Sequence, residues 1–133
     1  KQGQQVVIWQ DNKHSKSFAT LKTEAAALTA EAMGVGRPDA EAACLKCHAP
    51  LHEKAPALKA EGVTCEACHG PGSEYKKLPL MRDPAEAAKF GLLLYPTAES
   101  RKALCLPCHE NAHGLAFDFE AAWAKIKHPV PGR

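Results

Sequence analysis

Apolar residues recur along much of the chain at the spacing of a helix. Between Lys16 and Met33 they fall three or four positions apart and predict one amphipathic helix, with an apolar face formed by Phe18, Leu21, Ala25, Leu28 and Ala32. Gly34 follows directly and is a typical helix stop. No segment reads as a β-hairpin, so the pattern predicts a mostly α fold with little or no β-sheet.

Capping residues and helix breakers divide the rest of the chain into short helices. Asp39 is placed to cap the helix that follows it, and Asp118 to cap a last helix over 119–127 that Pro129 ends. Further starts are expected at Asp83-Pro84 and Pro96-Thr97, and further breaks at Pro56, Gly62, Gly70-Pro71-Gly72 and Gly91. We therefore expect a series of short helices joined by loops.

The length and composition predict one small domain with a thin core. At 133 residues, the chain 1–133 fits a single domain. Only 6% of the residues are aromatic, and alanine makes up much of the 45% apolar fraction, so the side chains alone would bury little volume. The formal charge is +2, there is no basic stripe for nucleic acid, and no apolar run has the length of a membrane span.

One pattern, Cys-x-x-Cys-His, occurs three times and uses all six cysteines. It is the attachment motif of c-type haem: both thiols bond to the porphyrin, and the histidine ligates the iron from one side. The sequence therefore predicts three covalently attached haem c groups, bound through Cys44, Cys47, Cys65, Cys68, Cys105 and Cys108, with iron ligands His48, His69 and His109. Three buried porphyrins would supply the missing apolar core, so we expect the haem-free chain to be largely unfolded.

Zinc binding and disulfide bonds are the two alternatives for six cysteines. The first two cysteine pairs are separated by 17 residues, a spacing that a four-thiolate zinc site also uses. Zinc would leave Cys105 and Cys108 unexplained, and it gives no reason for a histidine after every pair. A disulfide within Cys-x-x-Cys is the redox-active arrangement rather than a structural bond. Haem attachment is therefore the favoured interpretation.

Each motif supplies only one of the two axial ligands of an iron. Four other histidines remain for the second position: His14, His52, His113 and His128. Met33 and Met81 could also ligate iron, but we expect both to pack in the core. His52 and His113 each lie four residues after a motif histidine, which on a helix puts the two side chains on one face. Because the porphyrin separates the two axial ligands, either could serve only a neighbouring haem.

Three stretches carry a resemblance to a known family. They are Trp9-Gln10-Asp11-Asn12-Lys13-His14 with Ser17-Phe18, the second motif with its flanks from Gly62-Val63-Thr64 to Gly70-Pro71-Gly72-Ser73-Glu74-Tyr75, and Phe117-Asp118-Phe119-Glu120 leading to Trp123 and His128-Pro129. Together they resemble the multihaem cytochromes c of the cytochrome c-554 type. This resemblance implies that His14 and His128 are distal iron ligands, with His113 as the third choice and His52 as the fourth. Cytochrome c-554 has four haems, so its ligand pairing cannot be transferred whole to a chain with three motifs.

The haem motifs and the resemblance predict an electron carrier built as a small multihaem cytochrome c, with helices and loops around three haems. Thioether attachment needs export, and the chain begins at Lys1 with no signal peptide, so we expect a mature periplasmic or extracellular protein that exchanges electrons with other redox proteins. A surplus histidine that caps a haem of the next subunit would build a homo-oligomer or filament. The alternative is an enzyme in which one open iron binds nitrite, hydroxylamine or nitric oxide. No catalytic set is evident, and Tyr75 is expected to pack.

Overall fold

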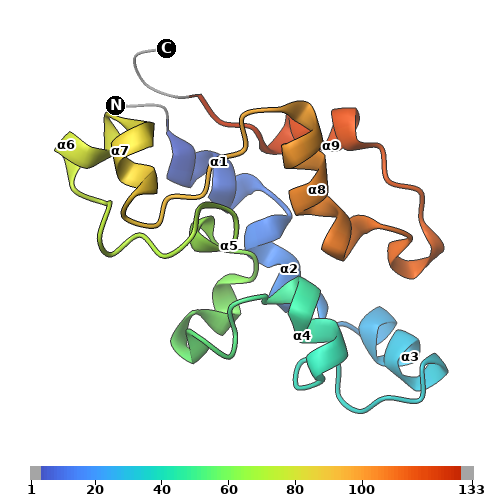
Figure 1. Ribbon diagram of the computed structural model, residues 1–133. Coiled ribbons are helices and arrows are strands. Elements are labelled where there is room, and N and C mark those ends of the chain that lie inside the picture. Colours follow the sequence, from blue (N-terminus) through green and yellow to red (C-terminus); the bar gives the residue numbers. More distant parts are fainter. Residues whose placement is uncertain (1–3, 130–133) are drawn as a thin grey trace. The chain divides into compact units, whose positions relative to one another are not determined.

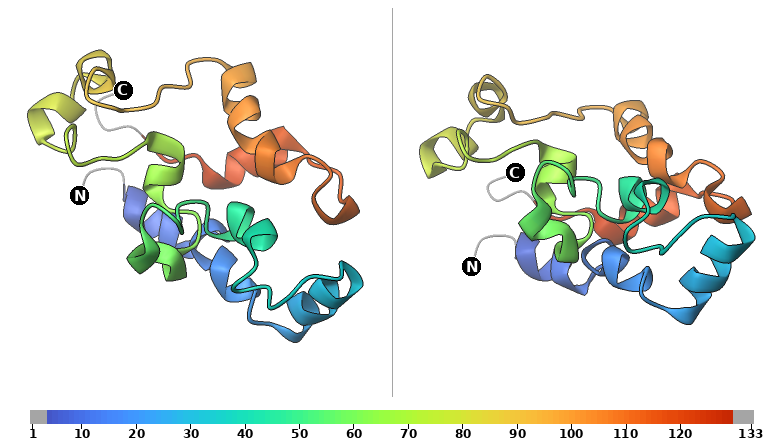
Figure 2. Two further views of the ribbon diagram at one scale, coloured as in Figure 1. Left: turned by 60° about the horizontal axis from the view of Figure 1, so that its bottom comes forward. Right: turned by 90° about the horizontal axis from the view of Figure 1, so that it is seen from below.

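The computed structural model describes residues 4–129, and in this range the chain forms helices, turns and loops but no strand (Figure 1, Figure 2). The α-helices are α1 Gln5–Asp11, α2 Ser17–Thr20, α3 Glu24–Ala32, α4 Ala42–His48, α5 Cys65–His69, α6 Leu78–Met81, α7 Pro84–Ala88, α8 Ala98–His109 and α9 Phe119–Ile126. Short 3₁₀ helices cover His14–Lys16, Pro56–Glu61 and Ala112–Gly114. The prediction of a mostly α fold is confirmed.

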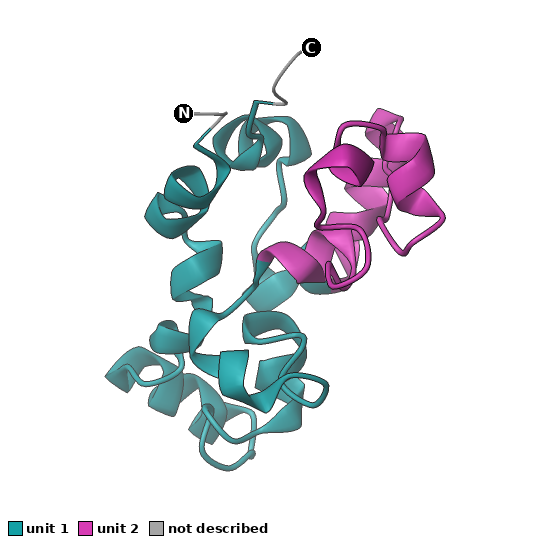
Figure 3. Cartoon of the chain, turned by 90° about the vertical axis from the view of Figure 1, so that its left-hand side faces the viewer, with its two compact units in different colours: residues 1–64, 108–133 teal, residues 65–107 magenta. Residues whose placement is uncertain are grey.

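The chain divides into two compact units (Figure 3). Unit 1 comprises residues 1–64 and 108–133, and unit 2 comprises residues 65–107. The division falls inside α8, so this helix belongs to both units. The single domain predicted over 1–133 is a statement about independent folding, and it stays a prediction.

Unit 1 has a small apolar core between α2 and α4. Phe18, Leu21, Leu45 and Ala49 are buried together, and Cys44 of the first motif packs against them. Among the described residues, no large side chain is fully buried. This is the thin core that the composition predicts, and it places the first haem motif directly on the core.

The single helix expected between Lys16 and Met33 is wrong, because the segment is divided into α2 and α3. The Thr20 hydroxyl donates to the Ser17 carbonyl at 2.6 Å, and the Thr23 hydroxyl donates to the Thr20 carbonyl at 2.7 Å. Such local bonds offer the backbone an alternative to continuing the helix. Thr23 then caps α3 by accepting a backbone N–H at 3.3 Å.

This division separates the apolar positions into a buried group and an exposed group. Phe18 and Leu21 lie in the core. Leu28 on α3 is 60% exposed, and Met33, at the C-terminal end of α3, is 57% exposed. Met81 is 56% exposed. The expectation that both methionines pack in the protein core is therefore wrong, and the apolar side of α3 lies at the surface of unit 1.

Two of the three capping aspartates act as predicted. The Asp83 carboxylate accepts two backbone N–H groups of α7 at 3.0 and 3.1 Å, and the Asp118 carboxylate accepts one of α9 at 3.0 Å. Asp39 does not cap α4, which begins after Glu41 without a side-chain cap. Asp39 instead accepts two hydrogen bonds from the Arg37 guanidinium at 2.9 and 3.2 Å, because this charge-assisted partner lies two residues away.

A tight turn at Gly62 joins the middle of the chain to its N-terminal segment. The Trp9 indole donates to the Val63 carbonyl at 2.8 Å, and the Val63 amide donates to the His14 carbonyl at 3.0 Å. Gly62 has φ of 70°, and a Cβ placed there would lie 2.6 Å from the His14 carbonyl oxygen and closer still to the Ser17 hydroxyl. The turn can approach this segment only because residue 62 is glycine.

Gly62→Ala is expected to lower the free energy of unfolding of the haem-loaded protein by at least about 2 kcal/mol, because strained φ and backbone overlap add. The matched control is Gly36→Ala, since a Cβ at Gly36 meets only the Glu41 carboxylate at 3.7 Å and no positive φ is involved. Thermal melts followed by circular dichroism measure both changes. Equal melting temperatures for the two variants would contradict this account of the turn.

No helix in the described part of the chain is long and apolar enough to cross a membrane.

Candidate haem-binding sites

Each of the three Cys-x-x-Cys-His motifs ends a helix, and the second motif makes up the whole of α5, Cys65–His69. α4 ends at His48, α5 ends at His69 and α8 ends at His109. The two cysteines of a motif are three residues apart, so one helical turn brings both thiols to the same face. Between residues 4 and 129 no cysteine is joined in a disulfide, and no group of three histidine, cysteine or acidic side chains forms a site for a metal ion.

The histidine of the first motif faces His113. The ring centroids of His48 and His113 are 6.4 Å apart, and the ring planes meet at 64°. His113 lies beyond the end of α8 with φ of 54°, in the left-handed region that few non-glycine residues adopt. The expectation that His113 shares a helical face with His109 is therefore wrong. The reversal of the chain after α8 turns His113 toward the first motif.

The histidine of the third motif faces His14. The ring centroids of His14 and His109 are 6.0 Å apart, with an interplanar angle of 57°. His14 begins the 3₁₀ helix that precedes α2, and its carbonyl accepts the Val63 amide described above. On its other side, the His109 ring stacks on Phe117 with centroids 4.7 Å apart. Both histidine pairs lie within unit 1.

The separations of the two ring pairs fit one iron between two imidazoles. A metal–imidazole bond is about 2 Å long, and the ring centroid lies about 1 Å behind the ligating nitrogen, so two ligands on opposite sides of an iron have centroids about 6 Å apart. The observed separations are 6.0 and 6.4 Å. The residues present at both sites therefore fit a haem iron with two histidine ligands.

A backbone carbonyl orients the His48 ring. Its Nδ1 lies 2.9 Å from the Ser17 carbonyl oxygen and 3.2 Å from the Thr20 hydroxyl oxygen. When Nδ1–H donates to the carbonyl, the opposite nitrogen, Nε2, carries the lone pair that a metal needs. Second-shell bonds of this kind are typical of histidines that ligate metals.

The surroundings of the His14/His109 pair favour neutral imidazoles. Burial lowers the pKa of His14, and the nearby His109 lowers it further. Burial also lowers the pKa of His109. Because only the neutral ring can ligate iron, both shifts favour the ligating form.

In unit 2, burial raises the pKa of the Cys68 thiol, and the neighbouring Cys105 and Cys65 raise it further.

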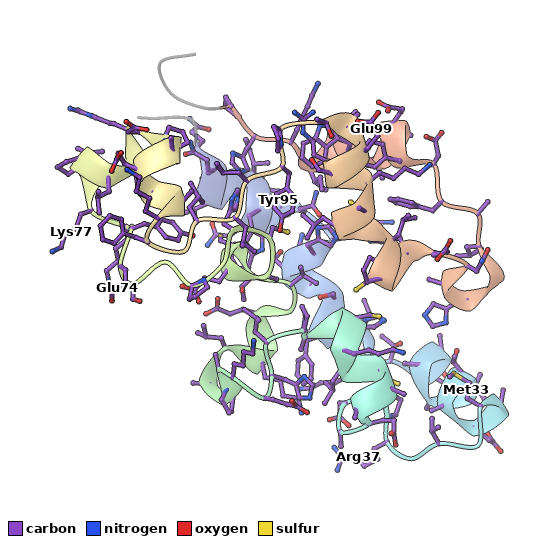
Figure 4. The ribbon with its side chains drawn as sticks, in the orientation of Figure 1. Met33, Arg37, Glu74, Lys77, Tyr95 and Glu99 are labelled. Carbon is purple, nitrogen blue, oxygen red and sulfur yellow. The ribbon has the colours of Figure 1, made fainter. Side chains whose placement is uncertain are left out.

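The exposed side of α3 borders the His48/His113 site. An open hollow of about 540 Å³ is lined by Leu28, Thr29, Ala32, Met33 and His113. Figure 4 shows Met33 at this end of α3. The lining is apolar apart from Thr29 and His113, as the face of a porphyrin requires. Sequence reasoning did not predict that this apolar face would be exposed beside His113.

The second motif is held by a network within unit 2. The buried Tyr75 hydroxyl lies 2.9 Å from the His69 carbonyl oxygen and 3.0 Å from the Gly70 carbonyl oxygen, so its single proton is shared between these two acceptors. The Leu93 amide also donates to the His69 carbonyl at 3.0 Å. Gly70 has φ of 77°, and a Cβ there would lie 2.5 Å from the Gly91 carbonyl oxygen. Tyr75 has the packing role that we expected for it.

His52 is held by its own turn, beyond the end of α4. Its Nδ1 lies 3.0 Å from the Ala49 carbonyl oxygen, and its Nε2 lies 3.9 Å from a Glu53 carboxylate oxygen. Because α4 ends at His48, the expectation that His52 shares a helical face with His48 is also wrong. Within unit 1 as described, no other histidine ring packs against His52. Its role as a ligand, and that of His128, stay predictions.

Comparisons with known proteins place the chain in a family. The model of the family described as "Cytochrome c554 and c-prime" matches residues 2–70, which is more than half of the chain. The C-type polyheme cytochromes OmcB of Geobacter sulfurreducens strains DL-1 / KN400 and ATCC 51573 / DSM 12127 / PCA are each 22% identical to it over 102 residues. These matches cover 68% of this chain but only 12% of each relative. No solved structure matches the chain. The chain belongs to the cytochrome c554 and c-prime family.

Proposed function

We propose that this electron-transfer cytochrome holds three haem c groups and that every iron has two histidine ligands. Its family carries haem c bound covalently and transfers electrons to and from redox partners. The number three is supported by the three motifs, each with two cysteines and a histidine at the end of a helix. When bound, the haems supply iron that cycles between the ferric and ferrous states.

The pairing of ligands is supported by the ring contacts in unit 1. Cys44, Cys47 and His48 hold the first haem, and His113 is its distal ligand. Cys105, Cys108 and His109 hold the third haem, and His14 is its distal ligand. The single observation that carries this assignment is the pair of centroid separations, 6.0 and 6.4 Å, that one iron between two rings requires. With both axial positions filled by the protein, neither iron is open to a substrate.

The distal ligand of the second haem follows from counting. After His14 and His113 are assigned, His52 and His128 remain for the iron that His69 holds. Family resemblance assigns a distal role to His128, whereas His52 is bonded within its own turn. We therefore assign His128 to the second haem and leave His52 as the surplus histidine.

The cellular setting follows from the cofactor. Covalent haem attachment needs export, which supports a periplasmic or extracellular protein with redox proteins as electron donor and acceptor. A head-to-tail assembly, in which His52 ligates a haem of the next subunit, is the filament variant of this proposal. The enzyme alternative, acting on nitrite, hydroxylamine or nitric oxide, needs one iron with an open face. Of the two tyrosines, Tyr75 is buried against backbone carbonyls and so is poorly placed to act on a substrate.

Haem content and spin state test the proposal together. We expect three haems per chain by pyridine haemochrome analysis, and three low-spin ferric signals by electron paramagnetic resonance. Replacing both Cys44 and Cys47 by serine should reduce the count to two and remove one low-spin signal. A high-spin signal from the unmodified chain would instead favour the enzyme alternative. A count below three would refute the assignment of one haem to every motif.

A further inference from the structure

One short segment contacts both histidine pairs of unit 1. His14, at its start, faces His109 of the third motif. Ser17, three residues later, places its carbonyl oxygen 2.9 Å from Nδ1 of His48 in the first motif. The distal ligand proposed for one haem and the group that orients the proximal ligand of another are therefore parts of the same turn of chain.

Ser17 connects these two sites through its side chain as well as its backbone. Its hydroxyl oxygen lies 2.8 Å from the His14 carbonyl oxygen and 2.8 Å from the His48 carbonyl oxygen. It also accepts the Val63 amide at 3.2 Å. The one hydroxyl proton is shared between the two carbonyls, so the hydroxyl holds the backbone of one histidine against that of the other.

We propose that Ser17 is a positioning residue shared by two haem sites: its carbonyl orients the His48 imidazole, and its hydroxyl fixes the backbones of His14 and His48 relative to each other. The inference rests on the proposed ligand pairs, His48 with His113 and His14 with His109. It goes beyond them because Ser17 itself ligates nothing, and because it makes the geometry of the first and third sites depend on one residue.

The bond to Nδ1 has a defined chemical effect. A carbonyl that accepts Nδ1–H fixes the tautomer and increases the basicity of the ligating nitrogen, which favours ferric iron and lowers the reduction potential. Thr20 adds a second oxygen 3.2 Å from Nδ1 and also donates to the Ser17 carbonyl. Gly62 packs closely against Ser17, because a Cβ there would overlap the Ser17 hydroxyl.

Ser17→Ala tests the shared role in the haem-loaded full chain. It removes the hydroxyl but keeps the carbonyl, so ligation persists while both histidines are less well fixed. We expect two of the three low-spin resonance signals to shift or broaden, and two of the three potentials in a spectroscopic redox titration to move. Ser100→Ala is the matched control, since the Ser100 hydroxyl donates to the carbonyl of Thr97, the residue before α8, and it should leave all three haems unchanged. Unchanged signals in Ser17→Ala, or a change at one haem only, would overturn the proposal.

Thr20→Val provides an independent test if Ser17→Ala yields too little holoprotein. It removes the second oxygen beside His48 Nδ1 and the hydrogen bond that the Thr20 hydroxyl donates to the Ser17 carbonyl, so one potential should change, whereas Thr20→Ser should keep it. Unchanged potentials in Thr20→Val would overturn the orienting role of this turn. The proposal can fail separately from the ligand assignment. If the unmodified chain lacks low-spin signals, the assignment itself fails; if those signals are present but insensitive to Ser17→Ala, only the shared role fails.

Discussion

Replacing all six motif cysteines by serine is expected to abolish the native fold, and not to leave a stable helical shell. The apolar cluster of unit 1 contains only Phe18, Leu21, Leu45 and Ala49, with Cys44 beside it. Large apolar side chains elsewhere remain at the surface, with exposures of 47–69% for Leu28, Met33, Leu78, Met81, Phe90, Leu93, Leu94 and Leu115. These side chains need an apolar partner, and bound porphyrins are the partner that the motifs provide.

The expected size of this effect follows from the burial that would be lost. Fully burying one leucine, phenylalanine or methionine stabilises a fold by about 1.5–3 kcal/mol. A domain is stable by only about 5–15 kcal/mol in total. Several apolar side chains left in water are therefore enough to cancel the whole free energy of folding. Folding should then be coupled to haem attachment, as it is to metal binding in small metal domains.

Circular dichroism and thermal melting of the haem-free variant measure this directly. We expect weak helical signal and no cooperative transition. The matched control replaces only Cys105 and Cys108, which should keep two haems and a cooperative but less stable fold. A sharp native-like melt of the six-serine variant would show that the polypeptide alone specifies the structure, contrary to this prediction.

Local signals in the sequence predicted the helix ends well. Asp83 and Asp118 cap the helices that they were expected to cap, and the chain leaves α5 at Gly70 as its glycine and proline pattern predicts. Caps and stops depend on residues that are close in the sequence, so they can be predicted from it. The failures are also local: Asp39 binds Arg37 instead of a helix end, and threonine hydroxyls divide the helix expected after Lys16.

The ligand pairs could be predicted only in part. Motif histidines follow from a five-residue pattern, and the resemblance implied a distal role for His14. Which rings face each other depends on contacts between residues far apart in the chain, such as His14 and His109. Helical spacing wrongly placed His113 on one helical face with His109. In the structure α8 ends at His109, and the chain then turns through residues with positive φ. Periodicity carries no information about such a reversal.

His14→Ala and His113→Ala are each expected to convert one low-spin iron to high-spin, because each removes the distal ligand of one haem. His52→Ala is the matched control: it also removes an imidazole from a turn after a helix, but it should leave the resonance spectrum unchanged. Added imidazole should restore the low-spin signal in the two ligand variants. A high-spin signal in His52→Ala would place His52 among the ligands and contradict the assignment.

Combining these variants with loss of one haem tests the pairing itself. In a chain with Cys44→Ser and Cys47→Ser, the first haem is absent, so His113→Ala should produce no high-spin iron. His14→Ala in the same background should still produce it, because its haem is held by Cys105 and Cys108. When Cys105 and Cys108 are replaced instead, His14→Ala should produce no high-spin iron and His113→Ala should still produce it. Ring pairs 6.0 and 6.4 Å apart predict this exchange of effects, whereas a histidine that only supports the fold would act equally in both backgrounds.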